Sequence, residues 1–217
     1  MTTLQNSRVA PLLDRLFTEA DTATSPIFRS LPGSERARLL DSKTEYLQLY
    51  SLMKDLWLPV SPETGRLLYM LARSIGAKTV IEFGTSFGIS TLFLASALRD
   101  NGGGRLITTE FEVSKVAKAR EHLTEGGLID LVEIREGDAL QTLSVGLPDQ
   151  VDLVLLDGAK PLYADVLRLV ENSLRPGALI IADNADLCPD YLEHMRTAHG
   201  NYLSVPIADD IELSIRL

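Results

Sequence analysis

Two apolar stretches with polar ends, VDLVLLDGAKPLY at Val151–Tyr163 and ALIIADN at Ala178–Asn184, decide the fold. Each reads as a buried β-strand; the first ends in Asp157, and the second ends in Asp183 and Asn184. The two aspartates lie 26 residues apart (157 to 183), about the length of one strand–helix–strand crossover. Such a crossover joins parallel strands and brings both strand ends to one edge of the sheet. If the strands are neighbours, about 4.8 Å apart, one small cation can contact all three oxygen ligands.

The chain from residue 79 onward alternates expected strands and helices, which predicts an α/β open sheet. The expected parallel strands are TVIEFG (79–84), RLITTE (105–110), LVEIREG (131–137), VDLVLLD (151–157) and ALIIADN (178–184). YLSVPI (202–207) and IELSIRL (211–217) follow with a short gap between them, which predicts an antiparallel hairpin. Open sheets of this kind bind ligands outside the carboxyl ends of their strands.

The N-terminal part of the chain reads differently from the rest. Residues 1–58 show helical spacing of apolar residues and are expected to form a helical extension, whereas residues 59–217 form the sheet-bearing domain. Within the extension, Thr24–Ser34 contains two prolines and a glycine and is expected to be a loop. We expect the extension to serve as a lid over the ligand or as a contact between two copies.

Composition narrows the classes of function. A net charge of −9 and a sequence pI of about 4.9 argue against nucleic acid as the main partner, because phosphate binding needs a basic surface. The single cysteine, Cys188, cannot form an internal disulfide and suits a reducing compartment. We find neither an apolar run of membrane-spanning length nor a signal-peptide pattern, so we expect a cytoplasmic protein without membrane association.

The turn after the first strand has the features of a nucleotide-binding loop. Gly84 and Gly88 permit close backbone approach, and the helix that follows offers free N–H groups to an anionic group. Their G-x-x-x-G spacing differs from the G-x-G-x-x-G of dinucleotide binders, which disfavours NAD. Glu110 ends the second strand, where a carboxylate can accept both hydroxyls of a ribose. Asp138 and Ala139 follow the third strand, where an adenine can lie.

From about residue 60 to the end, these motifs resemble the S-adenosylmethionine-dependent O-methyltransferases of the catechol and caffeoyl-CoA group. EFGTSFGIS (82–90) is similar to that family's first motif, E-x-G-x-x-x-G-x-S, and TTE (108–110) to its ribose-binding strand end. GDAL (137–140) is similar to the adenine-side segment, LDGAK (156–160) to the metal-and-lysine motif, and ADN (182–184) to the second metal motif. The linked D-x-x-K and D-N motifs are the most specific part of the match.

The resemblance implies a class I methyltransferase fold, a Rossmann-like, mostly parallel open sheet with an antiparallel C-terminal hairpin and N-terminal helices. It also implies a homodimer, S-adenosylmethionine as cofactor, a divalent cation such as Mg²⁺, and a small aromatic acceptor. The implied cofactor-binding residues are Val60, Glu82, Gly84, Thr85, Ser86, Gly88, Ser90, Glu110, Asp138, Ala139 and Asp157. Of these, Ser90 and the backbone around Val60 are implied to hold the methionine carboxylate. The implied metal ligands are Asp157, Asp183 and Asn184; Lys160 is the implied base, and Glu212 the implied residue that orients the acceptor.

This residue set suits methyl transfer to a catechol hydroxyl. A divalent cation bound to both vicinal oxygens lowers their pKa and fixes their direction. Two carboxylates and an amide leave positions open on an octahedral Mg²⁺ for the two substrate oxygens and a water. Small residues, Gly158 and Ala159, stand where some relatives carry bulkier ones, which predicts a roomier or differently walled acceptor pocket.

Other interpretations stay open at this point. Asp183 and Asn184 can cap a helix or form a turn, and Lys160 and Glu212 can simply face solvent. A metal-independent methyltransferase would then be the alternative, or a protein that binds S-adenosylmethionine without catalysis. Tyr50 and Trp57 are expected in the core or an interface rather than at the substrate, although their position also allows contact with the substrate. The histidines, His122, His194 and His199, lack metal-ligand spacing and are expected on the surface.

Overall fold

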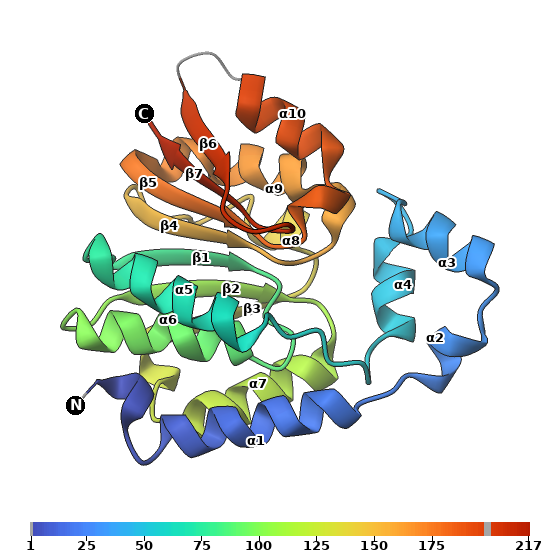
Figure 1. The fold of residues 1–217 in the computed structure, drawn as a ribbon, viewed down its shortest axis with the longest axis horizontal. Helices are drawn as coiled ribbons and strands as arrows, with labels where there is room; N and C mark the ends of the chain where they lie inside the picture. Colours follow the sequence, from blue (N-terminus) through green and yellow to red (C-terminus); the bar gives the residue numbers. More distant parts are fainter. Residues whose placement is uncertain (1, 198–200) are drawn as a thin grey trace.

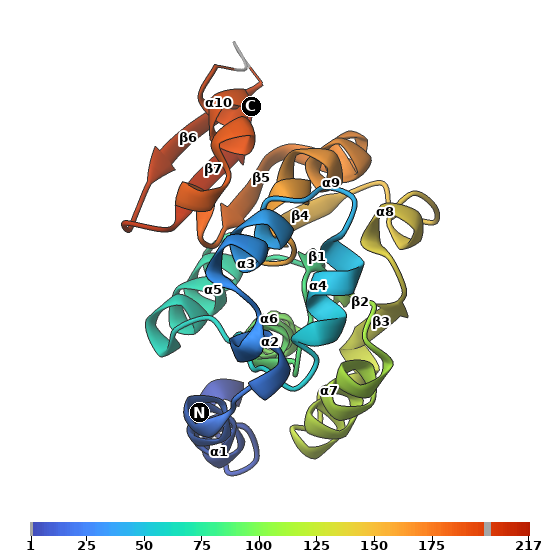
Figure 2. The ribbon, with the colours of Figure 1, turned by 90° about the vertical axis from the view of Figure 1, so that its right-hand side faces the viewer.

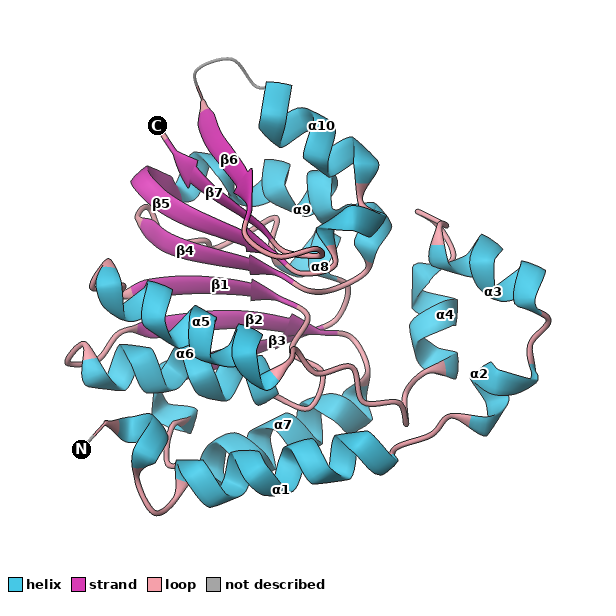
Figure 3. Ribbon diagram, viewed as in Figure 1, coloured by secondary structure: helices cyan, strands magenta, loops and turns pink. Residues whose placement is uncertain are grey.

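A computed structural model describes residues 2–197 and 201–217, and its centre is a seven-stranded sheet with the order β3-β2-β1-β4-β5-β7-β6 (Figure 3). The strands are β1 (Thr79–Phe83), β2 (Arg105–Glu110), β3 (Val132–Glu136), β4 (Val151–Leu156), β5 (Leu174–Ala182), β6 (Tyr202–Pro206) and β7 (Glu212–Arg216). Strands β1 to β5 pair in parallel, whereas β7 is antiparallel to β5 and β6 is antiparallel to β7. The expected α/β sheet with its antiparallel C-terminal hairpin is therefore confirmed.

The strand order reverses beside β1, and this reversal positions the site. The chain runs outward from β1 to β2 and β3, then returns to place β4 on the other side of β1. The loops after β1 and β4 diverge at such a point and leave a crevice at the carboxyl ends of the strands. The predicted ligand-binding residues at the ends of β1, β2, β4 and β5 consequently meet at one edge of the sheet.

Helices cover both faces of the sheet (Figure 1). They are α1 (Val9–Thr22), α2 (Pro26–Ser30), α3 (Gly33–Leu40), α4 (Tyr46–Leu52), α5 (Pro62–Ser74), α6 (Ile89–Asp100), α7 (Val113–Glu125), α8 (Ala139–Thr142), α9 (Tyr163–Val170) and α10 (Pro189–Thr197). Short 3₁₀ turns occur at η1 (Thr3–Gln5), η2 (Ile129–Leu131), η3 (Lys160–Leu162), η4 (Glu171–Ser173) and η5 (Ala185–Leu187).

Alternating side chains on the strands build two hydrophobic cores. In β4, Leu153 and Leu155 pack with α1, α5, α6 and α7 on one face, whereas Val154 and Leu156 pack with α9 and α10 on the other. All four side chains are fully buried. A central strand covered by helices on both faces carries such a continuous apolar run. The residue that follows, Asp157, is thereby fixed at the strand end.

The N-terminal helices fall into two groups. Helix α1 lies beside α7 in Figure 1, and its apolar face joins the same core as α6. Helices α2, α3 and α4 instead form a small core of their own around Leu39, Leu49 and Met53. Both Figure 1 and Figure 2 place these three helices beyond the carboxyl ends of the strands. We call α2, α3 and α4, residues 26–52, the lid segment. A domain boundary near residue 58 stays a prediction.

The prediction that Thr24–Ser34 is a loop is wrong in part, because α2 begins at Pro26 and α3 at Gly33. Ser25 caps α2: its hydroxyl accepts a hydrogen bond from the Phe28 amide at 3.3 Å and donates to the Leu52 carbonyl at 2.9 Å. A capping serine followed by proline at the first helical position starts a helix. The same pattern at Ser61 and Pro62 starts α5. None of the helices that the structure describes is both long and apolar enough to cross a bilayer.

Candidate functional site

The loop after β1 approaches the end of β4 so closely that only glycine fits at residue 84. Gly84 has φ +107°, and a Cβ atom there would lie 2.5 Å from the carbonyl oxygen of Asp157. The amide of Asp157 in turn donates to the carbonyl of Phe83 at 2.9 Å. Because a left-handed backbone and a backbone–backbone contact coincide at Gly84, the loop is held against the strand end that carries the predicted metal ligand.

Glu110 faces the pocket from the end of β2 and is held there by backbone amides. Its carboxylate accepts hydrogen bonds from the amides of Ser86, at 2.8 Å, and Glu112, at 3.0 Å. Burial raises the pKa of Glu110, while these amides and the ammonium of Lys115 oppose that rise. Two oriented donors leave the carboxylate with lone pairs that can accept ribose hydroxyls.

Two buried hydroxyls in this pocket lack partners. Ser86 Oγ and Thr109 Oγ1 are buried and make no hydrogen bond within the part of the chain that the structure describes. Both residues line the same cavity, about 70 Å³, together with Gly84, Glu110 and Asp138. Buried polar atoms are normally paired, so these two hydroxyls fit a ligand that brings its own polar groups. We call this the cofactor-side cavity.

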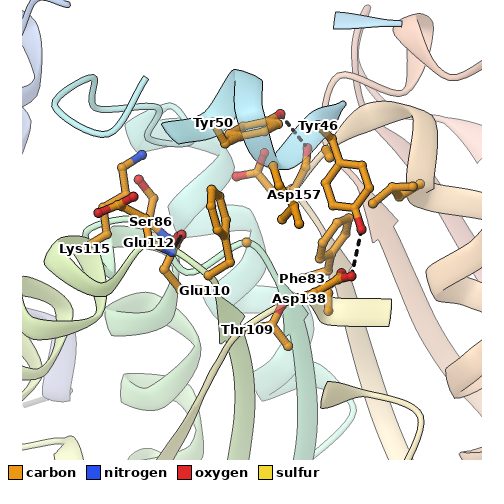
Figure 4. A pocket seen from close by; sticks show the side chains of 18 of the residues that line it. Tyr46, Tyr50, Phe83, Ser86, Thr109, Glu110, Glu112, Lys115, Asp138 and Asp157 are labelled. Carbon is orange, nitrogen blue, oxygen red and sulfur yellow. Dashed lines mark hydrogen bonds between the residues drawn. The ribbon is translucent and has the colours of Figure 1, made fainter. Parts of the chain in front are cut away.

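Asp138 and Ala139 lie at the far end of the same cavity, where the lid segment reaches them. Asp138 caps α8 by accepting from the Leu140 amide at 3.0 Å, and its second oxygen accepts from the Tyr46 hydroxyl at 2.8 Å. Figure 4 shows this contact across the pocket from α4 to the loop after β3. Burial and the Asp138 carboxylate raise the pKa of Tyr46 to about 12, so the phenol stays protonated and donates. A carboxylate oxygen has a second lone pair, which can accept from an adenine amino group.

Glu82 lies beneath the loop as a fully buried carboxyl group. It accepts from the hydroxyls of Ser90, Thr91 and Thr108, each at 2.6 Å. Burial raises the pKa of Glu82 to about 7, although the three donors oppose this rise. Thr85 Oγ1 joins the group through Thr108 Oγ1 at 2.5 Å. The Glu82 network therefore ties β1, β2 and the start of α6 together.

Ser90 and Val60, predicted at the methionine carboxylate, occupy different surroundings. Ser90 lines a small cavity of about 10 Å³ beside Gly84, but its hydroxyl is already committed to Glu82. Val60 is buried, and its neighbour Pro59 lines that small cavity. Gly88 starts α6 with φ +86°. These positions leave backbone amides, rather than the Ser90 hydroxyl, as donors at this end of the pocket.

The acidic end of the site joins Asp157 and Asp183 through a lysine and a tyrosine. Lys160 Nζ donates to Asp157 Oδ1 at 3.1 Å, to Tyr163 Oη at 2.8 Å and to the Asp183 carbonyl at 3.4 Å. Tyr163, which is fully buried, donates to the same Asp183 carbonyl at 2.8 Å. Its hydroxyl thus fixes the direction of the lysine chain. The D-x-x-K spacing is short enough for this contact because η3 turns the chain between Asp157 and Tyr163.

Burial and mutual repulsion act on the two aspartates. Desolvation raises the pKa of Asp157, and desolvation followed by the charge of Asp157 raises that of Asp183 to about 7. The charge of Lys160 opposes both rises. Two buried carboxyl groups that interact this closely gain from a cation near both.

Asn184 completes the set of oxygen donors that was predicted for a metal. It has a left-handed backbone, φ +51°, which asparagine tolerates better than most residues, and it starts the η5 turn. Among the described residues, no three His, Cys, Asp or Glu side chains come together as a metal cluster. The three predicted ligands, two carboxylates and one amide, line one cavity, and a metal site there stays a prediction. Oxygen ligands of this kind suit a hard cation such as Mg²⁺.

A second, larger cavity opens on the other side of Asp157. It holds about 530 Å³ and is lined by the predicted metal and lysine residues. Apolar side chains form much of the rest of the wall: Leu40, Met53, Leu58, Leu67, Leu187 and Ile211. A mostly apolar hollow with a few convergent polar groups is the usual form of a small-molecule site. We call this the acceptor-side cavity.

Some predicted residues lie elsewhere or act differently. Glu212 is buried, accepts from Arg196 at 3.0 and 2.7 Å, and does not line either cavity. Gly158 does not widen the acceptor-side cavity, because its missing Cβ makes room for the ring of Phe83, 2.5 Å from where that atom would be. His122 is buried rather than exposed, with Nδ1 2.9 Å from the Phe87 carbonyl. His194 is partly buried, and His199 lies outside the described residues.

Several site residues were missed from the sequence. Tyr46 and Tyr50 lie four residues apart on α4, so both face the pocket, but helical spacing alone suggested core packing. Lys115 lines the cofactor-side cavity and is only 3% exposed. Its ammonium lies 5.4 Å from the centre of the Phe87 ring. The position of Tyr163, three residues after Lys160, is the signal that identifies it in the sequence. Cys188 is buried, as expected for a structural residue.

Comparison with known proteins agrees with this geometry. A family model described as a methyltransferase domain matches residues 81–185. A catechol O-methyltransferase of Niastella koreensis is 38% identical over 128 residues, which cover 58% of this chain and 57% of that protein. A catechol O-methyltransferase of Mycobacterium tuberculosis is 35% identical over 125 residues, covering 58% and 56%. The chain thus matches little more than half the length of these curated relatives.

The fold is shared more widely than the sequence. The solved structure of an O-methyltransferase from Bacillus cereus, in complex with SAH, superimposes with a TM-score of 0.68 at 23% identity. The superposition covers 87% of this chain and 93% of that one. The likeness extends beyond the residues that the family model matches and includes most of the sheet and its helices.

Proposed function

Because the chain belongs to the S-adenosylmethionine-dependent O-methyltransferase family, we propose that it transfers a methyl group from this cofactor to a hydroxyl of a small catechol-type acceptor. One observation carries the proposal. The cofactor-side cavity, with Glu110 and Asp138, and the acceptor-side cavity, with Asp183 and Lys160, share Asp157 on their walls. A methyl donor in the first cavity and a hydroxyl acceptor in the second would meet there.

The cofactor-side residues support binding of S-adenosylmethionine through its separate parts. Glu110 would accept the ribose hydroxyls, and Asp138 with Ala139 would flank the adenine. The unpartnered hydroxyls of Ser86 and Thr109 fit a polar ligand in the same place. The amides of Ile89 and Ser90 at the start of α6 would hold the methionine carboxylate, since N–H groups at a helix start favour anions.

Asp157, Asp183 and Asn184 would hold a divalent cation at the edge of the acceptor-side cavity. The raised pKa values of the two buried aspartates and the all-oxygen donor set fit such an ion. When bound, the cation would supply Lewis-acid chemistry that acidifies and orients vicinal hydroxyls. Gly84 and Tyr163 contribute by fixing the strand end and the lysine against this set.

Lys160, acting as the neutral amine, is the group that we propose to take the proton from the hydroxyl being methylated. It becomes the ammonium as the methyl–sulfur bond of the cofactor breaks and S-adenosylhomocysteine leaves. Its Nζ lies at the wall of the acceptor-side cavity, 3.1 Å from Asp157 and 2.8 Å from the Tyr163 hydroxyl. These contacts aim the nitrogen while leaving it within the cavity. The acceptor oxygen then carries electron density toward the methyl group, and much of the rate comes from holding the two reactants in line.

A metal-independent methyltransferase is the second candidate, and one contact favours it. The Lys160 ammonium already provides a positive charge to Asp157 and lies near Asp183, so it offsets part of their repulsion without a metal. In that case Asp183 and Asn184 serve to shape the η5 turn.

Initial rates of catechol methylation with Mg²⁺, and with excess EDTA, separate the two candidates. The proposal expects the rate to vanish with EDTA and to return when Mg²⁺ is added in excess. Asp183→Asn should lower the rate and raise the Mg²⁺ concentration needed for half activity, while Asp186→Asn, an exposed aspartate of η5, serves as the matched control. Full activity in EDTA would count against the metal and favour the second candidate.

A further inference from the structure

The two cavities meet along a short boundary that the lid segment helps to form. Only Tyr50, Leu58, Asp157 and Gly158 line both the cofactor-side and the acceptor-side cavity among the described residues. Asp157 and Gly158 directly follow β4, whereas Tyr50 belongs to α4 and Leu58 to the segment before α5. A methyl group that passes from one cavity to the other must therefore pass between the strand end and two N-terminal side chains.

We infer that Tyr50 and Leu58 are the specificity-determining residues that decide which acceptor hydroxyl meets the methyl group. This inference rests on the proposed function, and it assigns a chemical role to residues outside the stretch that the methyltransferase family model matches. The acceptor would be held between the strand end and these two side chains.

The position of Tyr50 is set by contacts at both ends of its side chain. Its hydroxyl donates to the Gly158 carbonyl at 3.4 Å, and its ring packs against both the α9–α10 core and the small core of the lid segment. Burial raises the pKa of Tyr50, so the phenol stays neutral. Figure 4 shows the ring over Asp157, at the top of the pocket. A neutral, fixed aromatic ring is suited to limit the orientations of an aromatic acceptor.

Helix α4 is itself anchored, which makes Tyr50 a firm wall. One helical turn before it, Tyr46 donates to Asp138 at 2.8 Å. On another face of the same helix, the fully buried Leu49 packs with Leu39 and Met53 in the lid segment's own core. Residues four apart in a helix share a face, so both tyrosines point into the site while the apolar residues hold the helix.

Leu58 provides the other wall and is less embedded. It is 40% exposed and lines the cofactor-side cavity, the acceptor-side cavity and the small cavity beside Gly84. Because it is not part of a hydrophobic core, its truncation should leave the fold intact. It therefore offers a test that does not depend on the packing of α4.

The test uses 4-ethylcatechol, whose two hydroxyls give two distinguishable monomethyl products. Tyr50→Leu should shift the product ratio toward equality and lower kcat/KM by about ten- to hundredfold, because small misplacements of reactants are costly. Leu58→Ala should shift the ratio in the same direction. Tyr50→Phe keeps the ring and should restore most of the wild-type ratio, whereas Ser51→Ala, exposed on the same helix and outside both cavities, should match wild type.

Binding of 4-ethylcatechol to the protein saturated with S-adenosylhomocysteine and Mg²⁺, followed by calorimetry, gives a second readout without turnover. We expect a raised Kd for Tyr50→Leu and Leu58→Ala, with unfolding temperatures of Leu58→Ala and Ser51→Ala close to wild type. If Tyr50→Leu and Leu58→Ala turn over with the wild-type product ratio and Kd, the role of both residues is refuted while the proposed function stands. If wild type neither binds nor methylates the catechol, both the proposed function and this inference fail.

Discussion

The buried carboxyl group of Glu82 should make the stability of this protein depend on pH in a direction opposite to that of a salt-bridged carboxylate. Its pKa rises from 4.5 to about 7 on folding, mainly through burial. Between these values the unfolded chain loses the proton while the native protein keeps it. The native state is therefore favoured below pH 4.5, and this advantage is lost as the pH rises through 7.

The size of the effect follows from the shift. One pKa unit corresponds to about 1.4 kcal/mol, so a rise from 4.5 to about 7 corresponds to about 3 kcal/mol in total. Part of this is already lost at pH 5.5, so about 2 kcal/mol remains to be lost between pH 5.5 and 8.5. The lower limit lies above the sequence pI of about 4.9, where solubility is poorest.

Glu82→Gln removes this titration and keeps a side chain of similar size among the same hydroxyls. Urea unfolding of wild type and variant, at several pH values from 5.5 to 8.5, gives the free energy of unfolding of each. The variant-minus-wild-type difference should rise by about 2 kcal/mol over this range, because only wild type loses stability through Glu82. Taking the difference cancels the titration of Asp183, Glu110 and other shared groups. Glu136→Gln, an exposed carboxyl on β3, is the matched control.

A pH-independent difference for Glu82→Gln would refute this reasoning. It would mean that the hydroxyls of Ser90, Thr91 and Thr108, each at 2.6 Å, hold the carboxylate ionised as well as water does. The Glu82 network would then be a charged anchor under the cofactor loop rather than a protonated one.

Three further predictions follow from the same contacts. Gly84→Ala should lower the free energy of unfolding by at least about 2 kcal/mol, because its Cβ would lie 2.5 Å from the Asp157 carbonyl. In urea titration the control Gly76→Ala, which has a positive φ but open space around it, should lose only about 1 kcal/mol. Glu110→Gln should weaken S-adenosylmethionine binding about 10- to 100-fold in calorimetry, since a hydrogen bond to a charged group contributes about 1.5–3 kcal/mol, and a change below twofold would exclude a ribose contact. Lys160→Met should lower kcat about 10²–10⁴-fold with little change in cofactor affinity if the lysine is the base, and an unchanged kcat would refute that role.

The architecture was predictable because its signals lie within single strands. The apolar runs at 79–84, 105–110 and 151–157 are strands buried on both faces, and each has a polar residue at or just after its carboxyl end. Parallel pairing then brings Glu110 and Asp157 to one edge without any further information. The separation of Asp157 and Asp183 predicted their neighbouring strands for the same reason, since one crossover joins them.

The contacts of the lid segment were not predictable, because they join residues far apart in the sequence. Tyr46 reaches Asp138, 92 residues away, and Tyr50 reaches Gly158, 108 residues away. The helical spacing of these tyrosines indicated an apolar face but not what that face would contact. The short helix α2 was missed because Pro26 was interpreted as a helix breaker. Proline also starts a helix when it follows a capping serine, as Pro26 follows Ser25.

Close approach explains two further differences between sequence and structure. Gly158 was expected to make the acceptor pocket roomier or differently walled, but the Phe83 ring of the neighbouring strand occupies the space beside it. His122 was placed on the surface, yet it is buried beside Phe87 and Trp57, whose rings stack at 4.0 Å. The sequence around Gly158 and the sequence around His122 do not indicate these contacts. A homodimer stays a prediction, which light scattering at micromolar concentration can test.

Transfer of a trideuteromethyl group from labelled S-adenosylmethionine to catechol, followed by mass spectrometry in the presence of Mg²⁺, tests the central claim most directly. The account predicts a monomethylated catechol that carries the whole label on oxygen, formed at a rate that falls sharply in the Asp157→Asn variant. Binding of the cofactor without any labelled product, over a panel of catechols that enter the cavity beside Asp183, would contradict it.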